Sequence, residues 1–363
     1  MDISWLDPER LDRRDVDSAV AALEAARSID SPHRLSQTVT EFVAGLRYGW
    51  DGDRSLTALA KDDGGRVVAI LEVILPKWDN PRLGLVWVTV DPASRRQGIG
   101  RQLFELGVAR CRADERTLIG TDCYDLPASR AFLEAMGLAQ ASVELQRRQD
   151  LLALDWDRLD REFGEAERNA TDYELVLLPG VVPDELVDDI LRMTEAINDA
   201  PTDDWEIDDE VFSAERLRAF EISQAAHGRR LYRVVARHRA TGELAGHTVV
   251  GLEAERPWFG WQYDTSVLRT HRGHRLGLLL KIGMLRWLRT VEPQLRTVDT
   301  WNAASNDHMI AINEMIGYRV VATGLGWQRR LPEHPEGVGA VATATASGAR
   351  QPQPAAAPHD RQS

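Results

Sequence analysis

The sequence of 363 residues has only two cysteines, Cys111 and Cys123, and lacks any long hydrophobic run. Neither cysteine has the spacing of a metal site or a disulfide framework, so we expect two small core residues and no bound metal. The apolar run 276–280 is cut by Lys281 and is far too short to span a membrane. The first residues carry no basic patch followed by an apolar stretch, so no secretory signal is expected. These absences predict a cytoplasmic protein.

Positive charge is also scarce, with 44 lysine and arginine residues against 57 aspartate and glutamate residues and a net charge of −13. Binding to nucleic acid or to an anionic membrane depends on clustered lysine and arginine, so we expect neither partner. An acidic surface suits a cationic substrate such as an amine, although acidic surfaces also serve solubility alone.

The stretch 86–104 has the pattern of a strand, a turn and a helix. Apolar residues alternate over 86–90, Asp91 and Pro92 end the strand, and apolar residues recur at helical spacing after Gly98. Gly98 and Gly100 let the backbone approach a ligand, and free N–H groups at the start of a helix favour an anion. A glycine pair alone is equally compatible with an ordinary helix N-terminus. No Lys-Ser/Thr pair follows the glycines and no third glycine has dinucleotide spacing, which argues against nucleotide-binding loops of those two kinds.

The turn resembles the acyl-CoA loop of the GNAT superfamily of N-acetyltransferases. There, Arg/Gln-x-x-Gly-x-Gly/Ala follows the fourth strand, and Arg95, Gly98 and Gly100 fill those places. The resemblance implies that acetyl-CoA is the acyl donor and that backbone N–H groups of the loop bind its pyrophosphate. The cofactor-binding residues expected in this half are Val88, Val90, Arg95, Arg96, Gln97, Gly98, Ile99, Gly100 and Arg101.

The same order of elements recurs in the second half of the chain, where Arg272 to Gly277 stand in the place of the first loop. In the first half we expect helices at 15–26, 39–46, 99–113 and 127–136, and strands at 55–60, 67–75, 84–90, 118–121 and 143–145. In the second we expect helices at 183–197, 214–221, 278–285 and 307–315, and strands at 231–238, 244–250, 261–267 and 298–301. The sequence thus predicts an α/β (α+β) fold of two tandem GNAT-like domains, each a mixed, mostly antiparallel sheet flanked by helices.

The predicted boundaries place an N-terminal domain at 1–150, a charged helical linker at 151–169 and a C-terminal domain at 170–332. Residues 333–363 are rich in Ala, Pro, Gly and Gln, and we expect a disordered tail there. In the second half the expected cofactor-binding residues are Thr265, Val267, Arg272, Gly273, His274, Arg275, Leu276, Gly277, Asn302 and Asn306.

Acyl transfer to an amine requires a donor for the developing oxyanion, a base for the amine and an acid for the departing thiolate. In the superfamily the oxyanion donor is a backbone N–H of the fourth strand, here near 88–90 or 265–267. The acid is often a tyrosine in the helix after the fifth strand. That position is Leu133 in the first half and Asn313 in the second, so both halves depart from the family pattern. A thiolate is a tolerable leaving group, so transfer remains the expected reaction.

We favour the second half as the catalytic one. Asp264 stands within its fourth strand, whereas the first half has no carboxylate in that strand. Asp264 is the candidate base, although an acid bonded to loop N–H groups would fit equally well. Asn302 and Asn313 are the other candidate catalytic residues, and Arg275, in place of a glycine, could bring charge to a phosphate.

Other side chains have two readings. Trp258, Phe259, Trp261 and Tyr263 either wall a substrate pocket or only pack, as aromatics more often do. His247 and His308 are candidate proton carriers, and each is more often a surface or packing histidine.

The reaction expected from these residues is transfer of an acetyl group from acetyl-CoA to the amine of a small molecule. The tandem plan with one degenerate half resembles the mycothiol synthase group, in which the acceptor is the amine of a thiol precursor. A protein that binds acyl-CoA without catalysis is the rival interpretation, because both tyrosines are absent, and a nucleotide-binding fold is a more distant one. The sequence leaves the acceptor and the oligomeric state open.

Overall fold

The computed structural model describes residues 1–332, and the predicted tail at 333–363 lies outside the described residues. The elements of the first half are β1 (Asp2–Trp5), α1 (Arg13–Asp30), α2 (Val39–Tyr48), β2 (Leu56–Lys61), β3 (Val67–Ile74), β4 (Leu83–Val90), α3 (Ile99–Ala113), β5 (Leu118–Tyr124), α4 (Pro127–Ala135) and β6 (Ala139–Asp150). Those of the second half are α5 (Trp156–Asn169), β7 (Tyr173–Pro179), α6 (Val187–Thr194), α7 (Ala214–Ala226), β8 (Arg229–His238), β9 (Leu244–Glu253), β10 (Phe259–Val267), α8 (Leu276–Val291), β11 (Thr297–Ala303), α9 (Asp307–Met315) and β12 (Tyr318–Arg330).

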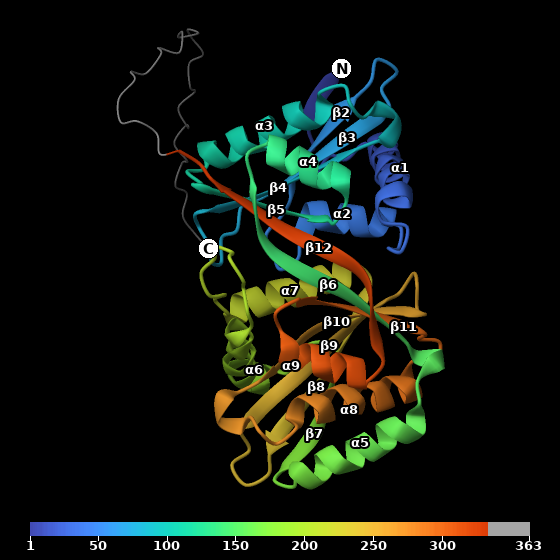
Figure 1. Ribbon diagram of the computed structural model, residues 1–363, viewed down its shortest axis with the longest axis vertical. Helices are drawn as coiled ribbons and strands as arrows, with labels where there is room; N and C mark the ends of the chain where they lie inside the picture. Colours follow the sequence, from blue (N-terminus) through green and yellow to red (C-terminus); the bar gives the residue numbers. More distant parts are fainter. Residues whose placement is uncertain (333–363) are drawn as a thin grey trace, which may run out of the picture. The chain divides into compact units, whose positions relative to one another are not determined.

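The predicted mixed α/β fold, with the same order of elements repeated in the second half, is confirmed (Figure 1). Local signals account for several boundaries: Asp12 caps α1, and a capping box of Thr38 and Glu41 starts α2. Strands β1, β7 and β12 have no counterpart among the elements predicted from the sequence, and only the middle of β6 was predicted.

The described strands form one continuous sheet in the order β1-β2-β3-β4-β5-β12-β6-β11-β10-β9-β8-β7. Its centre joins the two halves, because β12 pairs with β5 of the first half and β6 pairs with β11 of the second. The two exchanged strands also pair with each other over most of their length, as Figure 1 shows at the middle of the molecule. Neither half of the sequence therefore contains all the strands of its own half of the sheet.

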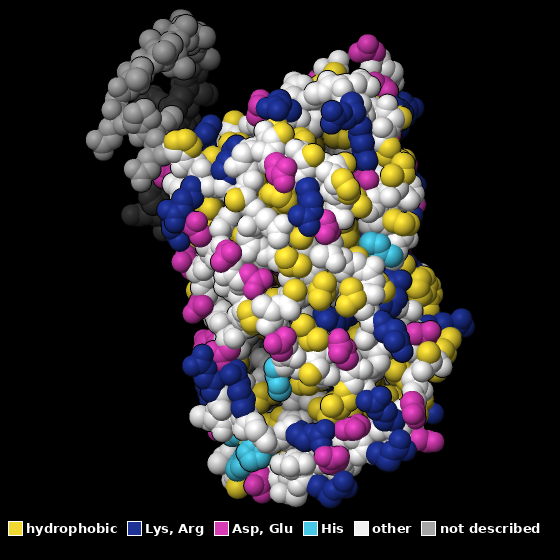
Figure 2. Space-filling view, in the orientation of Figure 1, with side chains coloured by type: hydrophobic (Ala, Val, Ile, Leu, Met, Phe, Trp, Pro, Cys, Tyr) yellow, Lys and Arg dark blue, Asp and Glu magenta, His cyan; other side chains and the backbone are white. Residues whose placement is uncertain are grey.

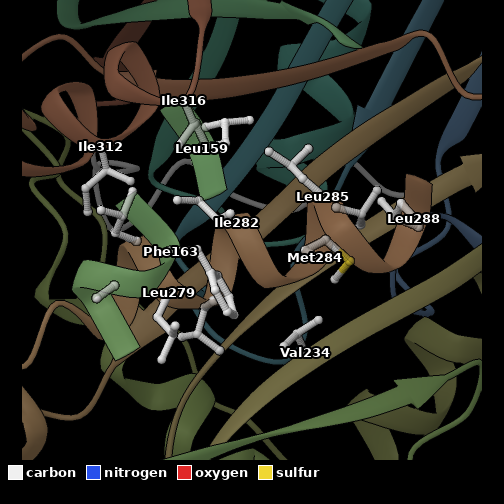
Figure 3. Close-up of a cluster of buried hydrophobic side chains, with 14 of the residues drawn as sticks. Leu159, Phe163, Val234, Leu279, Ile282, Met284, Leu285, Leu288, Ile312 and Ile316 are labelled. Atoms are coloured by element: carbon white, nitrogen blue, oxygen red, sulfur yellow. The ribbon is translucent and has the colours of Figure 1, made fainter. Parts of the chain in front are cut away.

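Helices cover both faces of the sheet in each half. In the first half α3 and α4 pack on one face and α1 and α2 on the other. In the second half α5, α8 and α9 pack on one face, and α6 covers the other. Figure 3 shows Leu159 and Phe163 of α5 within the cluster formed with α8. The segment expected as a linker thus supplies part of the second core, and the division into separately folding domains stays a prediction.

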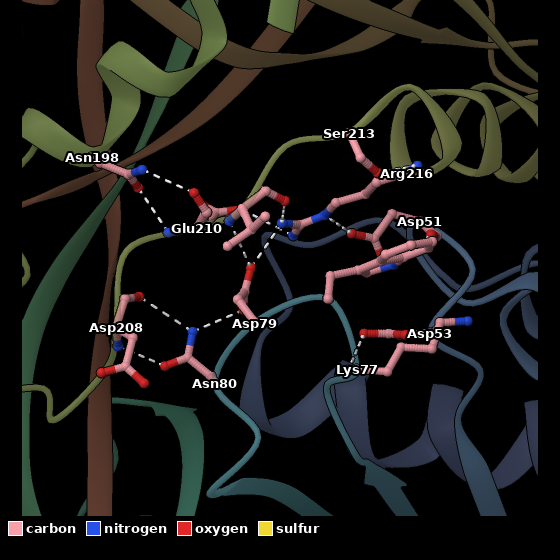
Figure 4. A network of polar contacts seen from close by, with 12 residues as sticks. Asp51, Asp53, Lys77, Asp79, Asn80, Asn198, Asp208, Glu210, Ser213 and Arg216 are labelled. Carbon is pink, nitrogen blue, oxygen red and sulfur yellow. Dashed lines mark hydrogen bonds and ion pairs between the residues drawn. The ribbon is translucent and has the colours of Figure 1, made fainter. Parts of the chain in front are cut away.

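The connection between α6 and α7 reaches across to the first half. Trp205 donates a hydrogen bond from Nε1 to Ser142 Oγ of β6 at 2.8 Å. At the start of α7, Arg216 donates to Asp51 and Asp79 of the first half at 2.7 Å each, and it also pairs with Glu210 (Figure 4). The Arg216 side chain is 15% exposed, so these ion pairs are largely withdrawn from water. The polar cluster holds the two halves together away from the central strands.

Charged side chains of both signs are interspersed over the face of the molecule shown in Figure 2. Among the described residues, no helix combines the length and the apolar character needed to cross a membrane.

The strand exchange makes the first core depend on β12. Trp327 of that strand is 3% exposed and belongs to the cluster formed by α3, α4 and the first strands, so we expect Trp327→Ala to lower the free energy of unfolding by about 3–5 kcal/mol. Val320→Ala, at a half-exposed position of the same strand, is the control, with an expected change within about 0.5 kcal/mol. Denaturant titration measures the change in stability, and amide hydrogen exchange should show lost protection in β3 to β5. Loss of protection confined to the second half would contradict the exchange of strands between the halves.

Candidate functional site

The two glycine loops have the same backbone conformation although their glycines are placed differently. In the first loop Arg96 and Gly98 have φ of 64° and 83°, and in the second Gly273 and Arg275 have φ of 89° and 56°. Two left-handed residues therefore precede each helix, and each loop places a glycine at one of them and an arginine at the other. Neither α3 nor α8 has a side-chain cap at its N-terminus. The first N–H groups of both helices are thus free of side-chain acceptors, which is the requirement for an anion site.

The first arginine of each loop has a structural role. Arg95 Nε donates to the carbonyl oxygen of Val90 at 3.1 Å, and Arg272 Nε donates to that of Val267 at 3.0 Å. Each guanidinium also pairs with an aspartate, Asp30 in the first half and Asp199 in the second. These contacts fasten the loop to the end of the preceding strand. Both arginines were expected among the cofactor-binding residues, and here they shape the loop.

Arg275, expected to bring charge to a phosphate, has its guanidinium on α5. It pairs with Glu162 at 3.0 Å and also with Glu165. The neighbouring His274 contacts the carbonyl oxygen of Asn169 at 3.3 Å through Nδ1. Helix α5 therefore holds these two side chains, and the free backbone N–H groups are the donors that remain to the second loop.

In each half, two neighbouring parallel strands separate after the first few paired residues. Parallel pairing joins β4 to β5 only over 83–85 and β10 to β11 only over 259–261. In the second half the register of β10 against β9 also shifts between Gln262 and Thr265, whereas β4 runs against β3 without a shift. Tyr263 and Asp264 lie in this irregularity, where a strand is bent and its side chains are redirected.

A cavity of about 1770 Å³ fills the space between the opened strands, and both halves line it. The second half contributes the loop residues Arg272, Gly273, Arg275, Leu276 and Gly277, together with Asp264, Thr265, Val267, Lys281, Asn302 and Asn306. The first half contributes Val88 and a group of acidic and aromatic side chains: Glu72, Trp87, Asp122, Tyr124 and Glu144. Of the expected site residues, Val90, Arg95 to Arg101, His274 and Asn313 are not among the described residues that line it. The second loop, and not the first, opens into the cavity.

Asp264 is half-buried on the cavity wall. Burial raises the pKa of its carboxyl group, and the charges of Arg233 and Arg216 oppose that rise. Among the described residues, none donates a hydrogen bond to its carboxylate. A carboxylate with a raised pKa and free oxygens is suited to accept a proton from an amine.

The two expected catalytic asparagines bind each other, with Asn313 Nδ2 donating to Asn302 Oδ1 at 2.7 Å. Asn313 is fully buried, and its Oδ1 has no hydrogen-bond partner among the described residues. Asn302 extends to the cavity, whereas Asn306 uses its Oδ1 to accept from the backbone N–H of Met309 and so caps α9. Asn306 is therefore occupied as a helix cap.

The structure distinguishes cavity-lining from packing roles among the aromatic and histidine side chains for which the sequence left both interpretations open. Trp261 and Tyr263 line the cavity, whereas Phe259 lies in the core and Trp258 is exposed. His308 lines the cavity. His247 is fully buried against Arg233, and burial holds the pKa of its imidazole well below the usual value.

Four polar residues on the cavity wall were missed by the sequence analysis: Glu72, Asp122, Glu144 and Lys281. Burial raises the pKa of each of the three carboxyl groups and lowers the pKa of Lys281 to about 7. Lys281 did leave a signal, because it is the one charged residue in the apolar stretch 276–285. The three carboxylates come from three different strands. Their proximity depends on the pairing of those strands, so it could not be predicted from neighbouring residues in the sequence.

Comparison with known proteins agrees with this architecture. The model of the Acetyltransferase (GNAT) family matches residues 23–138. Among solved structures, the chain is similar to a tandem GNAT protein from the clavulanic acid biosynthesis pathway, with 27% sequence identity, a TM-score of 0.73, and coverage of 92% of this chain and 100% of that one. A GCN5-related N-acetyltransferase from Sphaerobacter thermophilus shares the fold at 16% identity, with a TM-score of 0.61 and coverage of 90% and 95%.

A GCN5-related glucosamine N-acetyltransferase region of a fungal multi-domain GH3 beta-N-acetylglucosaminidase has the same fold at 12% identity and a TM-score of 0.62; the match covers 90% of this chain and 38% of that one. A search of curated proteins found no match. None of these similarities bears on the mycothiol synthase group, which stays a prediction. The family model on the first half and the tandem architecture of the whole support a tandem-domain GNAT acetyltransferase, and the general chemistry of that family is acyl transfer.

Proposed function

We propose that the protein transfers an acetyl group from acetyl-CoA to the amine of a small molecule, and that the second half is catalytic. The observation that supports this assignment is that the uncapped start of α8 and the carboxylate of Asp264 face one cavity. An anion site beside a candidate base is what transfer from a CoA thioester to an amine requires.

The second loop is suited to hold a pyrophosphate. A Cβ at Gly273 would meet no atom within 4 Å, so the loop is open at this point. The N–H groups of the loop and of the first turn of α8 would bind the phosphates, and the backbone of β10 near Thr265 would donate to the thioester oxygen. Acetyl-CoA would supply the activated acyl group. The uncapped start of α3 makes the first loop a candidate for a second CoA molecule.

The remainder of the cavity suits a cationic acceptor. Asp264 would take the proton of the amine, and Glu72, Asp122 and Glu144 of the first half would offer it negative charge. Burial disfavours the ionised form of the half-buried Glu72, Glu144 and Asp264, so an ammonium group in the cavity would offset that cost. Trp87 and Trp301 add aromatic faces on which a cation can lie. The amine of a thiol precursor is one acceptor of this class.

Asp264→Asn keeps the shape of the side chain and removes the base. We expect kcat/KM to fall by roughly 10²–10⁴, because a base of this kind contributes about that factor. The measurement is release of CoA thiol across a panel of small amines, with acetyl-CoA binding followed by calorimetry. Asp122→Asn, on β5 of the first half and lining the same cavity, is the matched variant, for which we expect kcat to be retained. Loss of kcat in Asp122→Asn but not in Asp264→Asn would place the chemistry in the first half. If acetyl-CoA binds but no amine supports turnover, the protein is a noncatalytic acyl-CoA-binding protein.

Gly273→Val puts a β-branched residue at a φ of 89° in the second loop. We expect the dissociation constant of acetyl-CoA to rise at least about tenfold, because the backbone N–H groups would be turned away from the phosphate. Gly65→Val, in the turn between β2 and β3 at a φ of 79°, imposes a similar backbone strain in the first half, outside the second loop. Calorimetry should show wild-type affinity for that control. Gly98→Val tests the first loop, and unchanged turnover in it would agree with catalysis in the second half.

A further inference from the structure

Lys281 is a buried amine on the wall of the catalytic cavity. It lies on α8, one helical turn after Gly277, and is 2% exposed. Leu278 of α8 and Ile312 and Met315 of α9 line the same cavity, and Nζ lies 5.4 Å from the centre of the Tyr318 ring. Among the described residues, none accepts a hydrogen bond or forms an ion pair with this amine. Burial of an ammonium group without a partner is costly, so packing alone does not account for it.

The position itself does not require a lysine. The residue at the same distance from the second glycine of the first loop is Phe104, which packs edge-on against Phe132 of α4. An aromatic side chain thus fills the position in one half, and an amine fills it in the other.

The direction of the side chain brings the amine toward the second loop. Side chains of a helix lean toward its N-terminus, so Lys281 extends back over the turn that contains Gly277. Gly277 has no side chain to obstruct it, and both residues line the cavity. The amine therefore belongs to the same cavity wall as the loop to which the proposed function assigns CoA.

We propose that Lys281 donates a proton to the CoA thiolate as it leaves, in place of the tyrosine that both halves lack. This inference rests on the proposed acetyl transfer in the second half. The nitrogen of the acceptor attacks the thioester carbon, the C–N bond forms and the C–S bond breaks. The sulfur takes a proton from the Lys281 ammonium, and the proton lost by the acceptor passes through Asp264 to solvent. Solvent then reprotonates the lysine.

The ionisation of Lys281 suits this task. Burial lowers the pKa of its amine to about 7, below that of a free thiol at ~8.5, so transfer from the ammonium to the thiolate is favourable. Close to the amine lies the Tyr318 phenol of β12, and the nearby Asp299 of β11 pairs with Arg148. On α9, Asn313 offers only a neutral amide with an unpaired Oδ1. Little therefore counteracts the effect of burial.

The test is the pH profile of kcat for the full chain with Lys281→Met and Lys281→Gln. In the wild type we expect kcat to fall above about pH 7 as the ammonium is lost. In both variants we expect kcat at pH 7 to drop roughly 100-fold, at the low end for an acid catalyst, and this basic limb to disappear. The affinity for acetyl-CoA should stay within about twofold, which separates a role in the chemistry from one in binding. Phe104→Met, at the matching position of the first half, is the control.

A second measurement reports folding independently of activity. The folded state binds the Lys281 proton less tightly than the unfolded state, so wild-type stability should rise between about pH 7 and 10. Lys281→Met should lack that rise and have a higher melting temperature at pH 7. If the wild type turns over and both variants keep its kcat and its basic limb, the role of Lys281 would be overturned while the proposed function would stand. Absence of wild-type turnover with any amine would overturn the proposed function and this inference together.

Discussion

The exchange of β6 and β12 is the constraint on which the rest of the structure depends. Because β12 lies between β5 and β6, the two halves share one hydrogen-bonded sheet and cannot separate without breaking its centre. The polar cluster around Arg216 ties the halves at a second place, where the connection before α7 meets the first half. With both attachments in place, the opened strands of the two halves face a common cavity whose walls come from distant parts of the chain.

This cavity collects the groups that burial disfavours. Acidic side chains from both halves line it with raised pKa values, and an amine without a partner lies on its wall. Such groups lower stability unless a ligand compensates them, which is why their concentration at one place indicates function rather than packing. Two buried carboxylates elsewhere differ, because Asp299 pairs with Arg148 and Glu292 with Arg230.

Local patterns predicted the repeated architecture and both loops, because strand and helix periods and turn glycines act over short distances. The α9 boundaries agree with the structure, whereas β12 escaped notice because its small and polar residues give little strand alternation. The exchange itself depends on pairing between residues far apart in the sequence. The same limit applies to the site: the second loop and Asp264 were found from short motifs, but Glu72 and Glu144 reach the cavity only through the sheet.

The shared sheet also has a consequence for synthesis. Most residues of the first half leave the ribosome long before Leu325 and Trp327, yet these two side chains complete its core. Until residues 318–330 emerge, the edge of β5 stays unpaired, and an exposed strand edge invites association with other chains. The first half therefore stays incompletely folded during synthesis until β12, which is encoded some 170 codons after the end of β6, has been translated.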